Sequence, residues 1–122
     1  MTGVQTCALP ISRDGQLLNV NADTLAAHLA SALGARRLVI AGGTSGVLDE
    51  AGRTIQCLDS RGAARMIKAG TANRGMVAKL EACRAALRKG VGDVLIANGR
   101  EVALETLAAA KGPLSGCTQV VR

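Results

Sequence analysis

The chain has 122 residues, the length of one ordinary domain, and 48% of them are hydrophobic while 20% are charged. This balance is typical of a folded protein, and the longest apolar runs (38–41 and 94–97) are far below the ~18 residues of a membrane-spanning helix, so we expect a soluble domain with no membrane partner. The net charge of +6 favours anionic partners, but the chain has no Phe, Tyr or Trp on which nucleic-acid bases could stack, and we expect no nucleic-acid partner.

The first eleven residues, MTGVQTCALPI, do not fit the pattern that follows. They carry no charge, have no basic start and lack an apolar stretch long enough for a signal peptide. The segment resembles the translation of a sequencing-library adapter joined in frame to a gene, and a disordered natural N-terminus is the alternative. Either origin predicts a non-native or disordered leader over residues 1–12 and a folded domain over residues 13–122.

The sequence after Arg13 alternates between helix-like and strand-like segments. An apolar stripe at helical spacing is formed by Leu25, Leu29, Ala32 and Leu33. Asp23 is well placed to cap the start of this helix, and Gly34 to end it. The run 38–41 predicts a strand that ends in the glycine-rich stretch 42–46, and such strand ends are where α/β sheets bind ligands.

The rest of the chain continues this alternation. We expect a β-hairpin over 47–57, a helix from Ser60 to Gly70, a helix from about Gly75 to Lys89, a strand over 94–97, a helix over 101–110 and a last strand over 117–121. Strands separated by helices predict an α/β fold, a three-layer αβα sandwich with a mainly parallel sheet covered on both faces.

The segment Asn19-Val20-Asn21-Ala22-Asp23 gathers two carboxamides and a carboxylate at a strand-to-helix junction. Carboxamides both donate and accept hydrogen bonds, which suits the orientation of a carboxylate or amide substrate near the free N–H groups of a helix start. Turn chemistry followed by a helix cap explains the same residues equally well.

Lys79 is the second candidate for chemistry. The helix that begins near Gly75 carries an apolar stripe formed by Met76, Leu80, Cys83 and Leu87. Lys79 lies about 60–70° from the centre of that stripe, so its stem can cover apolar surface while its ammonium reaches a cleft. This position suits a phosphate-directed lysine and a structural lysine equally. Glu81, Arg84 and Arg88 lie off the stripe and are expected to be solvated.

The glycine-rich stretch, the cysteines, the histidine and the basic residues do not by themselves predict a specific binding or catalytic site. The stretch 42–46 is neither a Walker A loop nor a GxGxxG fingerprint. The four cysteines (Cys7, Cys57, Cys83 and Cys117) lack zinc-binding spacing and predict free thiols in a reducing compartment, and His28 is expected to be a packing or surface residue. We predict no metal site in the chain itself. Between Arg61 and Lys89, eight basic residues against one acid predict a mostly solvated basic face.

Taken in order, the segments NVNADTLAAHLASALGA, GTSGVLDEAGRTI, TANRGMVAKLEACRAAL, VLIANGR and GCTQVV resemble the C-terminal half of the acetylglutamate kinases, within the amino acid kinase superfamily. The resemblance covers residues 17–121, and its NxNAD-T and GMxxKxxA motifs are specific in combination. It implies the C-terminal half of the amino acid kinase fold, a nucleotide-binding domain.

The resemblance also implies a role for each matching residue. Asn19 corresponds to the asparagine that contacts acetylglutamate, Asp23 to the aspartate that orients the catalytic lysines, and Lys79 to the lysine that stabilises the transferring phosphoryl group. The implied ATP-binding residues are Gly43, Thr44, Ser45, Gly46, Val47, Leu48, Thr71, Ala72 and Asn73, with Gly75 and Met76 close by.

The implied reaction is phosphorylation of the side-chain carboxylate of N-acetyl-L-glutamate by ATP, with Mg²⁺ carried by the nucleotide, in cytoplasmic arginine biosynthesis. Where relatives often have an acidic residue and a small aliphatic residue, this chain has Gly43-Thr44, which puts adenine or ribose contacts through that side chain in doubt. The family's N-terminal domain, with a second lysine, a glycine-rich phosphate loop, most of the acetylglutamate pocket and the main oligomer contacts, is not represented in this sequence. We therefore expect the chain alone to be inactive, and the full-length relatives to be homo-oligomers.

Besides a weak and steeply salt-dependent nucleic-acid binder, which only the net charge of +6 suggests, two other functions fit the residues. The first is a related carboxylate kinase of lysine biosynthesis that acts on an aminoadipate derivative. The second is a nucleotide-binding module without catalysis, in which Lys79 would be dispensable.

Overall fold

A four-stranded sheet forms the centre of the computed structural model, which describes residues 7–122. The elements in chain order are β1 (Cys7–Ala8), β2 (Val20–Asn21), α1 (Ala22–Ala32), β3 (Arg37–Gly42), β4 (Cys57–Asp59), α2 (Ser60–Ala69), α3 (Arg74–Arg88), β5 (Asp93–Asn98), α4 (Leu104–Ala109) and β6 (Cys117–Val121). No helix within residues 7–122 is both long and apolar enough to cross a membrane.

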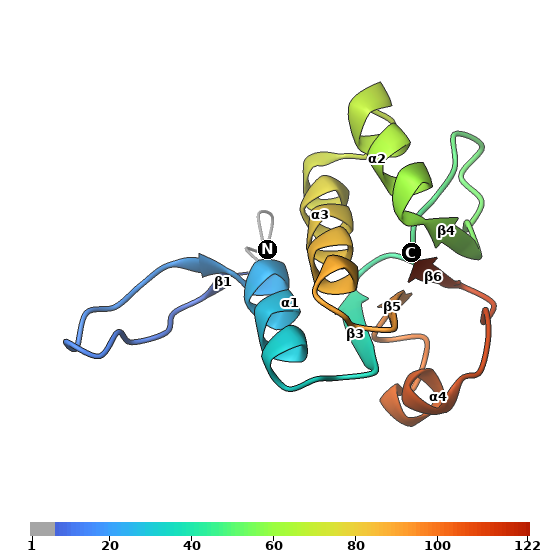
Figure 1. Ribbon diagram of the computed structural model, residues 1–122. Helices are drawn as coiled ribbons and strands as arrows, with labels where there is room; N and C mark the ends of the chain where they lie inside the picture. The colour runs from blue at the N-terminus through green and yellow to red at the C-terminus, as the bar shows by residue number, and fades with distance from the viewer. Residues whose placement is uncertain (1–6) are drawn as a thin grey trace.

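The sheet has the strand order β3-β5-β6-β4. β3 pairs with β5, and β4 with β6, in parallel, while β5 and β6 meet antiparallel in the middle. Helices α1, α2 and α3 cover one face and α4 covers the other, as Figure 1 shows. The predicted αβα sandwich with a mainly parallel sheet is confirmed.

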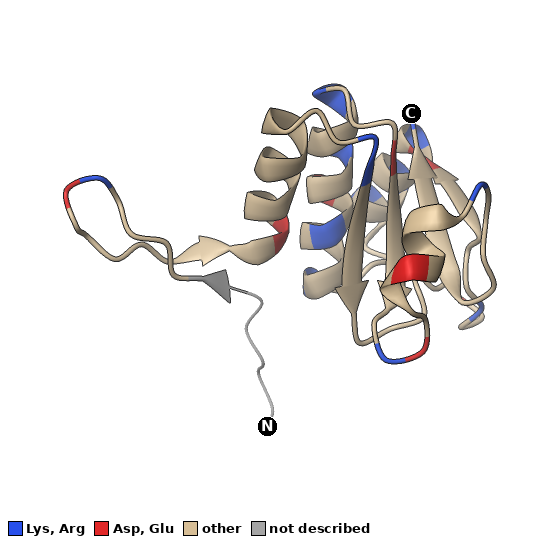
Figure 2. Cartoon of the chain, turned by 90° about the horizontal axis from the view of Figure 1, so that it is seen from below, with Lys and Arg blue, Asp and Glu red and all other residues tan. Residues whose placement is uncertain are grey.

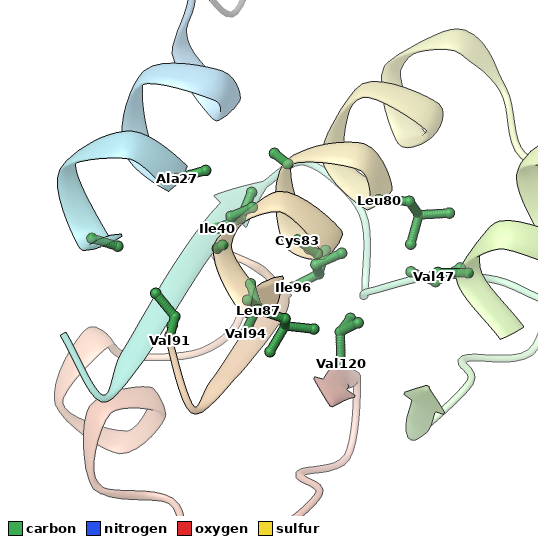
Figure 3. Packing of buried hydrophobic residues seen from close by; sticks show 14 residues of the cluster. Ala27, Ile40, Val47, Leu80, Cys83, Leu87, Val91, Val94, Ile96 and Val120 are labelled. Atoms are coloured by element: carbon green, nitrogen blue, oxygen red, sulfur yellow. The ribbon is translucent and has the colours of Figure 1, made fainter. Parts of the chain in front are cut away.

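β5 contributes to the core on both faces of the sheet. Val94 and Ile96 belong to the cluster that α1, α2 and α3 cover, and Leu95 and Ala97 belong to the cluster under α4. This division follows from the alternation of side chains along a strand. Figure 3 shows the first cluster, in which Leu80, Cys83 and Leu87 of α3 meet the strand residues. The apolar stripe predicted for α3 is confirmed.

Residues 7–21 form a separate hairpin that extends away from the sheet (Figure 1). Cys7 and Ala8 pair with Asn21 and Val20, and a further bridge joins Ile11 to Leu17. Residues 1–6 of the predicted leader lie outside the described residues. The rest of that leader is paired with the segment that leads into α1, and its non-native origin stays a prediction.

The predicted helix caps of α1 and α2 were wrong by one or two residues. Asn21, not Asp23, caps α1 by accepting a hydrogen bond from the backbone N–H of Thr24 at 3.1 Å. Asp59, not Ser60, caps α2. In each case the earlier residue holds the extended backbone of a cap, and Asp23 is left inside the first helical turn of α1.

The apolar stripe predicted for α1 does not face the core. Leu29 and Leu33 are 53% and 80% exposed, whereas Asp23, Ala27 and Ala30 are buried. α1 packs side by side with α3, so Ala27 and Ala30 turn inward while Leu29 and Leu33 turn outward. α4 is also shorter than predicted, because residues 98–102 form a turn in which the Asn98 carbonyl accepts two backbone hydrogen bonds.

Candidate functional site

Asp23 and Lys79 form an ion pair between α1 and α3. The Lys79 Nζ lies 3.1 Å from Oδ2 and 3.3 Å from Oδ1 of Asp23, although the two residues are 56 positions apart in the chain. Their side chains are 8% and 14% exposed, that of Asp23 being the more buried. Figure 2 shows the acidic start of α1 (red) facing a basic turn of α3 (blue). The structure therefore brings the two candidate catalytic residues together.

The pair sits at the carboxyl edge of the sheet, beside the last residue of β3. A Cβ atom on Gly42 would lie 3.4 Å from Cε of Lys79, so the lysine stem passes directly over the end of that strand. Gly42 pairs in register with Asn98, the last residue of the parallel strand β5. This is the edge at which open α/β sheets bind ligands. The glycine-rich stretch 42–46, called the glycine turn below, begins there.

The pair lies beside the start of a helix and a buried thiol. Asp23 lies in the first turn of α1, where the helix dipole favours a negative charge. Cys83, one helical turn after Lys79, is fully buried, and this burial together with the nearby Asp23 charge raises the pKa of its thiol to about 12. The thiol therefore stays neutral at physiological pH and adds no charge beside the ion pair.

Thr118 anchors the glycine turn to the sheet. Its hydroxyl accepts a hydrogen bond from the backbone N–H of Val47 at 2.7 Å and donates one to the carbonyl of Ile55 at 2.6 Å. Gly46 has φ +75°, and a Cβ there would lie 2.5 Å from the Thr118 Oγ1. Sequence reasoning missed Thr118, and its one signal was a hydroxyl residue inside an apolar terminal strand.

The glycine turn is also linked to the loop after β5. The Ser45 hydroxyl donates a hydrogen bond to the Glu101 carboxylate at 2.8 Å, and Thr54 donates one to the carbonyl of Ser45. Asn98 reaches the carbonyl of Gly43 at 3.5 Å. These contacts hold the turn from both sides.

Most of the predicted nucleotide-binding residues line one cavity of about 150 Å³. It is lined by Thr44, Gly46, Val47, Leu48, Thr71, Ala72, Asn73 and Met76 from the predicted set, and by Asp49 and Met66, which were not predicted. Gly43, Ser45 and Gly75 do not line it. The cavity forms because Gly70, with φ +72°, turns the chain sharply after α2, and Asn73 then caps α3.

Asn19 makes no contact with the ion pair through a hydrogen bond. It is exposed and stands immediately before β2, two residues ahead of the cap of α1. Its side chain makes no hydrogen bond to any residue that the structure describes. The structure thus places Asn19 near the start of α1 without tying it to the pair.

The sequence matches the family model described as "Amino acid kinase family" over residues 4–98. It is 45% identical over 92 residues to the acetylglutamate kinase of Afipia carboxidovorans, covering 75% of this chain and 31% of that one. It is 44% identical over 92 residues to the acetylglutamate kinase of Bradyrhizobium diazoefficiens, with the same two shares. The chain therefore spans about three-tenths of the length of these curated relatives.

Solved structures show the same fold. An N-acetylglutamate synthase from Neisseria gonorrhoeae, in complex with coenzyme A and N-acetyl-glutamate, superimposes with a TM-score of 0.80 at 23% identity, covering 93% of this chain and 26% of that one. A carbamate kinase from Giardia lamblia, bound to AMP-PNP, gives a TM-score of 0.66 at 15% identity, covering 94% and 36%. At these identities the likeness concerns the fold alone.

Proposed function

The chain belongs to the amino acid kinase family, and from this we propose that it supplies the Asp23–Lys79 site of an acetylglutamate kinase. The reaction is ATP-dependent phosphorylation of the side-chain carboxylate of N-acetyl-L-glutamate to an acyl phosphate, in arginine biosynthesis. One observation carries the proposal: the buried Asp23–Lys79 pair lies over the end of β3, where the glycine turn begins. The identity of 45% to an acetylglutamate kinase supports the choice of acceptor.

Lys79 acts by charge. Phosphoryl transfer needs positioning and neutralisation of developing charge more than covalent help from the protein. The Lys79 ammonium, held in place by both carboxylate oxygens of Asp23, provides a fixed cation at the sheet edge. Asp23 is a positioning residue in this scheme, because its carboxylate is occupied by the lysine.

The residues of the 150 Å³ cavity fit part of a nucleotide. Val47, Leu48, Met66 and Met76 offer aliphatic surface for a base, while Thr44, Thr71 and Asn73 offer polar atoms. The volume is below the roughly 300–1,000 Å³ of a complete small-molecule site, so the phosphates would extend toward the open glycine turn. Nothing lies within 4 Å of a Cβ built on Gly43, which leaves its backbone open to a close approach. Mg-ATP supplies the phosphoryl group when bound, and Mg²⁺ travels with it.

Asn19 would hold the acceptor. Its exposed carboxamide can donate to a carboxylate, and its position before α1 places it near the helix start that carries Asp23. The remaining groups, including a second lysine and most of the acetylglutamate pocket, would come from parts of the complete enzyme that this sequence does not represent. We place that enzyme in the cytoplasm as a homo-oligomer.

A chimaera tests the proposal. Residues 17–121 replace the matching segment of the Afipia carboxidovorans acetylglutamate kinase, and acetylglutamate-dependent ADP release is measured. We expect activity, and a loss on the order of 10²–10³-fold in kcat for Lys79→Met. Lys68→Met is the matched control, because Lys68 is an exposed lysine at the end of α2.

The alternatives predict other results. Preference for an aminoadipate derivative over acetylglutamate would point to a kinase of lysine biosynthesis. A Lys79→Met chimaera as active as the Lys68→Met control would contradict the role of Lys79. Nucleotide binding without any turnover in a correctly folded chimaera would favour a module without catalysis.

A further inference from the structure

A groove of about 560 Å³ runs between α1 and α3, separate from the cavity beside the glycine turn. Asp23 and Lys79 do not line it, although they belong to the same two helices. It opens to solvent, because Asn21, Thr24, His28, Glu81, Arg88 and Lys89 on its walls are all exposed. Its volume is typical of a site for a small molecule.

Alanines create the groove. The two helices lie side by side, and where they approach each other the residues are Ala27, Ala78, Ala82 and Ala85. Ala27 and Ala82 are 3% and 4% exposed and form its base. A methyl group fills little of the space between two helix axes, so a channel remains above these residues instead of a packed interface.

The walls of the groove are mainly basic. Arg84 and Arg88 of α3 and Lys89, which caps the end of α3, stand against one acid, Glu81. Lys89 Nζ lies 3.0 Å from Nδ1 of His28 on α1. Among the residues that the structure describes, neither arginine nor Lys89 forms a salt bridge, and Glu81 pairs with none of them. The groove therefore concentrates positive charge that no acidic side chain neutralises.

Arg84 departs from the sequence prediction of a solvated side chain. It is half-buried, and within residues 7–122 its Nε is the buried side-chain nitrogen that lacks a hydrogen-bond partner. No acceptor within residues 7–122 therefore holds the Arg84 guanidinium through Nε, and Arg84 lines the groove. A guanidinium pairs best with a carboxylate or phosphate, which it binds through two parallel hydrogen bonds.

We propose that the α1–α3 groove binds a small organic anion with two or more carboxylate or phosphate groups. The anionic groups pair with Arg84, Arg88 and Lys89, the ligand body lies on the alanine base, and Asn21 and Thr24 hydrogen-bond its far end. A single ion would leave most of the groove unfilled, which favours a ligand with several heavy atoms. This site does not depend on the proposed kinase function, because it uses none of the residues assigned to it.

The test is calorimetric titration of the chain with two probes, inorganic pyrophosphate and citrate, which separate phosphate from carboxylate recognition. We expect saturable binding of at least one probe. The double variant Arg84→Gln/Arg88→Gln weakens that binding by about tenfold or more, since it removes two charge-assisted contacts. The matched control is Arg61→Gln/Arg65→Gln, which removes the same charge at the same spacing from exposed positions on α2.

Two further variants distinguish binding in the groove from binding at the Asp23–Lys79 edge. Ala85→Leu fills the groove without a change in charge and is expected to weaken binding, whereas Asp23→Asn/Lys79→Met, which removes both charges of the edge pair, leaves groove binding in place. The proposal is overturned if neither probe saturates at about 20 mM, if the α2 control weakens binding as much as the groove variant, or if folded Asp23→Asn/Lys79→Met no longer binds. If Arg84→Gln/Arg88→Gln fails to fold, Arg88→Gln, at an exposed position, replaces it under the same criteria.

Discussion

The Nζ of Lys79 and the carboxylate of Asp23 form two contacts of 3.1 and 3.3 Å in a place where both side chains are almost entirely buried. Taking two charges out of water is costly, and the attraction between them offsets that cost only while both are present. The stability of the fold therefore depends on both charges being present, in addition to their candidate role in catalysis. The pair joins α1 and α3, two of the three helices that cover the same face of the sheet.

The first prediction concerns this pair. Lys79→Met leaves the Asp23 carboxylate buried without a partner and is expected to lower the free energy of unfolding by about 3 kcal/mol. The double variant Asp23→Asn/Lys79→Met removes both charges and is expected to recover most of that loss. Urea unfolding of the two single variants and the double variant measures the coupling. Strictly additive effects would contradict a direct interaction.

The second prediction concerns Thr118. Thr118→Val keeps the side-chain shape but leaves the buried N–H of Val47 without an acceptor, which costs about 1–3 kcal/mol in unfolding free energy. Because the hydroxyl also links to Ile55, the glycine turn loses its anchor on both sides, and binding of a non-hydrolysable ATP analogue is expected to weaken. Thr106→Val, at an exposed position on α4, is the control. Equal effects of the two variants on analogue binding would rule out a special role for Thr118.

The third prediction compares two glycines of the same turn. Gly46→Ala forces an L residue into φ +75° and brings its Cβ within 2.5 Å of the Thr118 hydroxyl, so we expect a loss of more than about 1–2 kcal/mol in unfolding free energy. Gly43→Ala meets nothing within 4 Å and has no positive φ, so its stability is expected to stay close to the wild type. Thermal unfolding followed by circular dichroism separates the two. A Gly46→Ala variant as stable as Gly43→Ala would show that the turn shifts freely.

These residues show what the sequence could and could not predict. The alternation of apolar runs and glycines located β3, β5 and β6 and the helices, and the motifs placed Asp23 and Lys79 at one edge. The prediction of a β-hairpin over 47–57 was wrong, because that segment forms only a bridge between Leu48 and Thr54, and Cys57–Asp59 is strand β4, which pairs in parallel with β6. The exposure of Leu29 and Leu33 could not be predicted, because the face that α1 buries depends on the helix packed against it. Thr118 was missed because its partners, Val47 and Ile55, are more than sixty residues away along the chain.

The fourth prediction concerns acid stability at the opposite end of β3. Arg37 donates hydrogen bonds to both oxygens of Asp93, and these bonds hold the pKa of that carboxyl below its usual value. The folded-state pKa is thus lower than the unfolded one, so the pair stabilises the fold above about pH 4, and that contribution is lost as the pH falls through the folded-state pKa.

The variant Arg37→Gln tests this dependence. It is expected to lower stability at pH 7 and to flatten the fall in stability between about pH 5 and pH 2. Arg37 also donates to the carbonyls of Leu107 and Ala110 at the end of α4, so part of the loss at neutral pH reflects that contact. Arg53→Gln, which breaks a largely exposed ion pair with Asp49, is the control. An unchanged pH profile in Arg37→Gln would contradict the assignment to Asp93.

The last prediction is that the isolated chain does not catalyse the proposed reaction. The Lys79 ammonium is a single cation. In the transition state, the transferring phosphoryl group spreads negative charge over three oxygens and needs several hydrogen-bond donors or cations around it. The chain spans about three-tenths of the length of its curated relatives, and the cavity beside the glycine turn holds only part of a nucleotide. With only part of the nucleotide contacts, the chain is expected to bind ATP weakly. It is not expected to accelerate phosphoryl transfer, because only interactions gained in the transition state raise the rate. Purified chain at high concentration, incubated with Mg-ATP and acetylglutamate, should therefore release ADP at the rate of the Lys79→Met variant. Acetylglutamate-dependent release above that rate would show that this chain already contains a complete site.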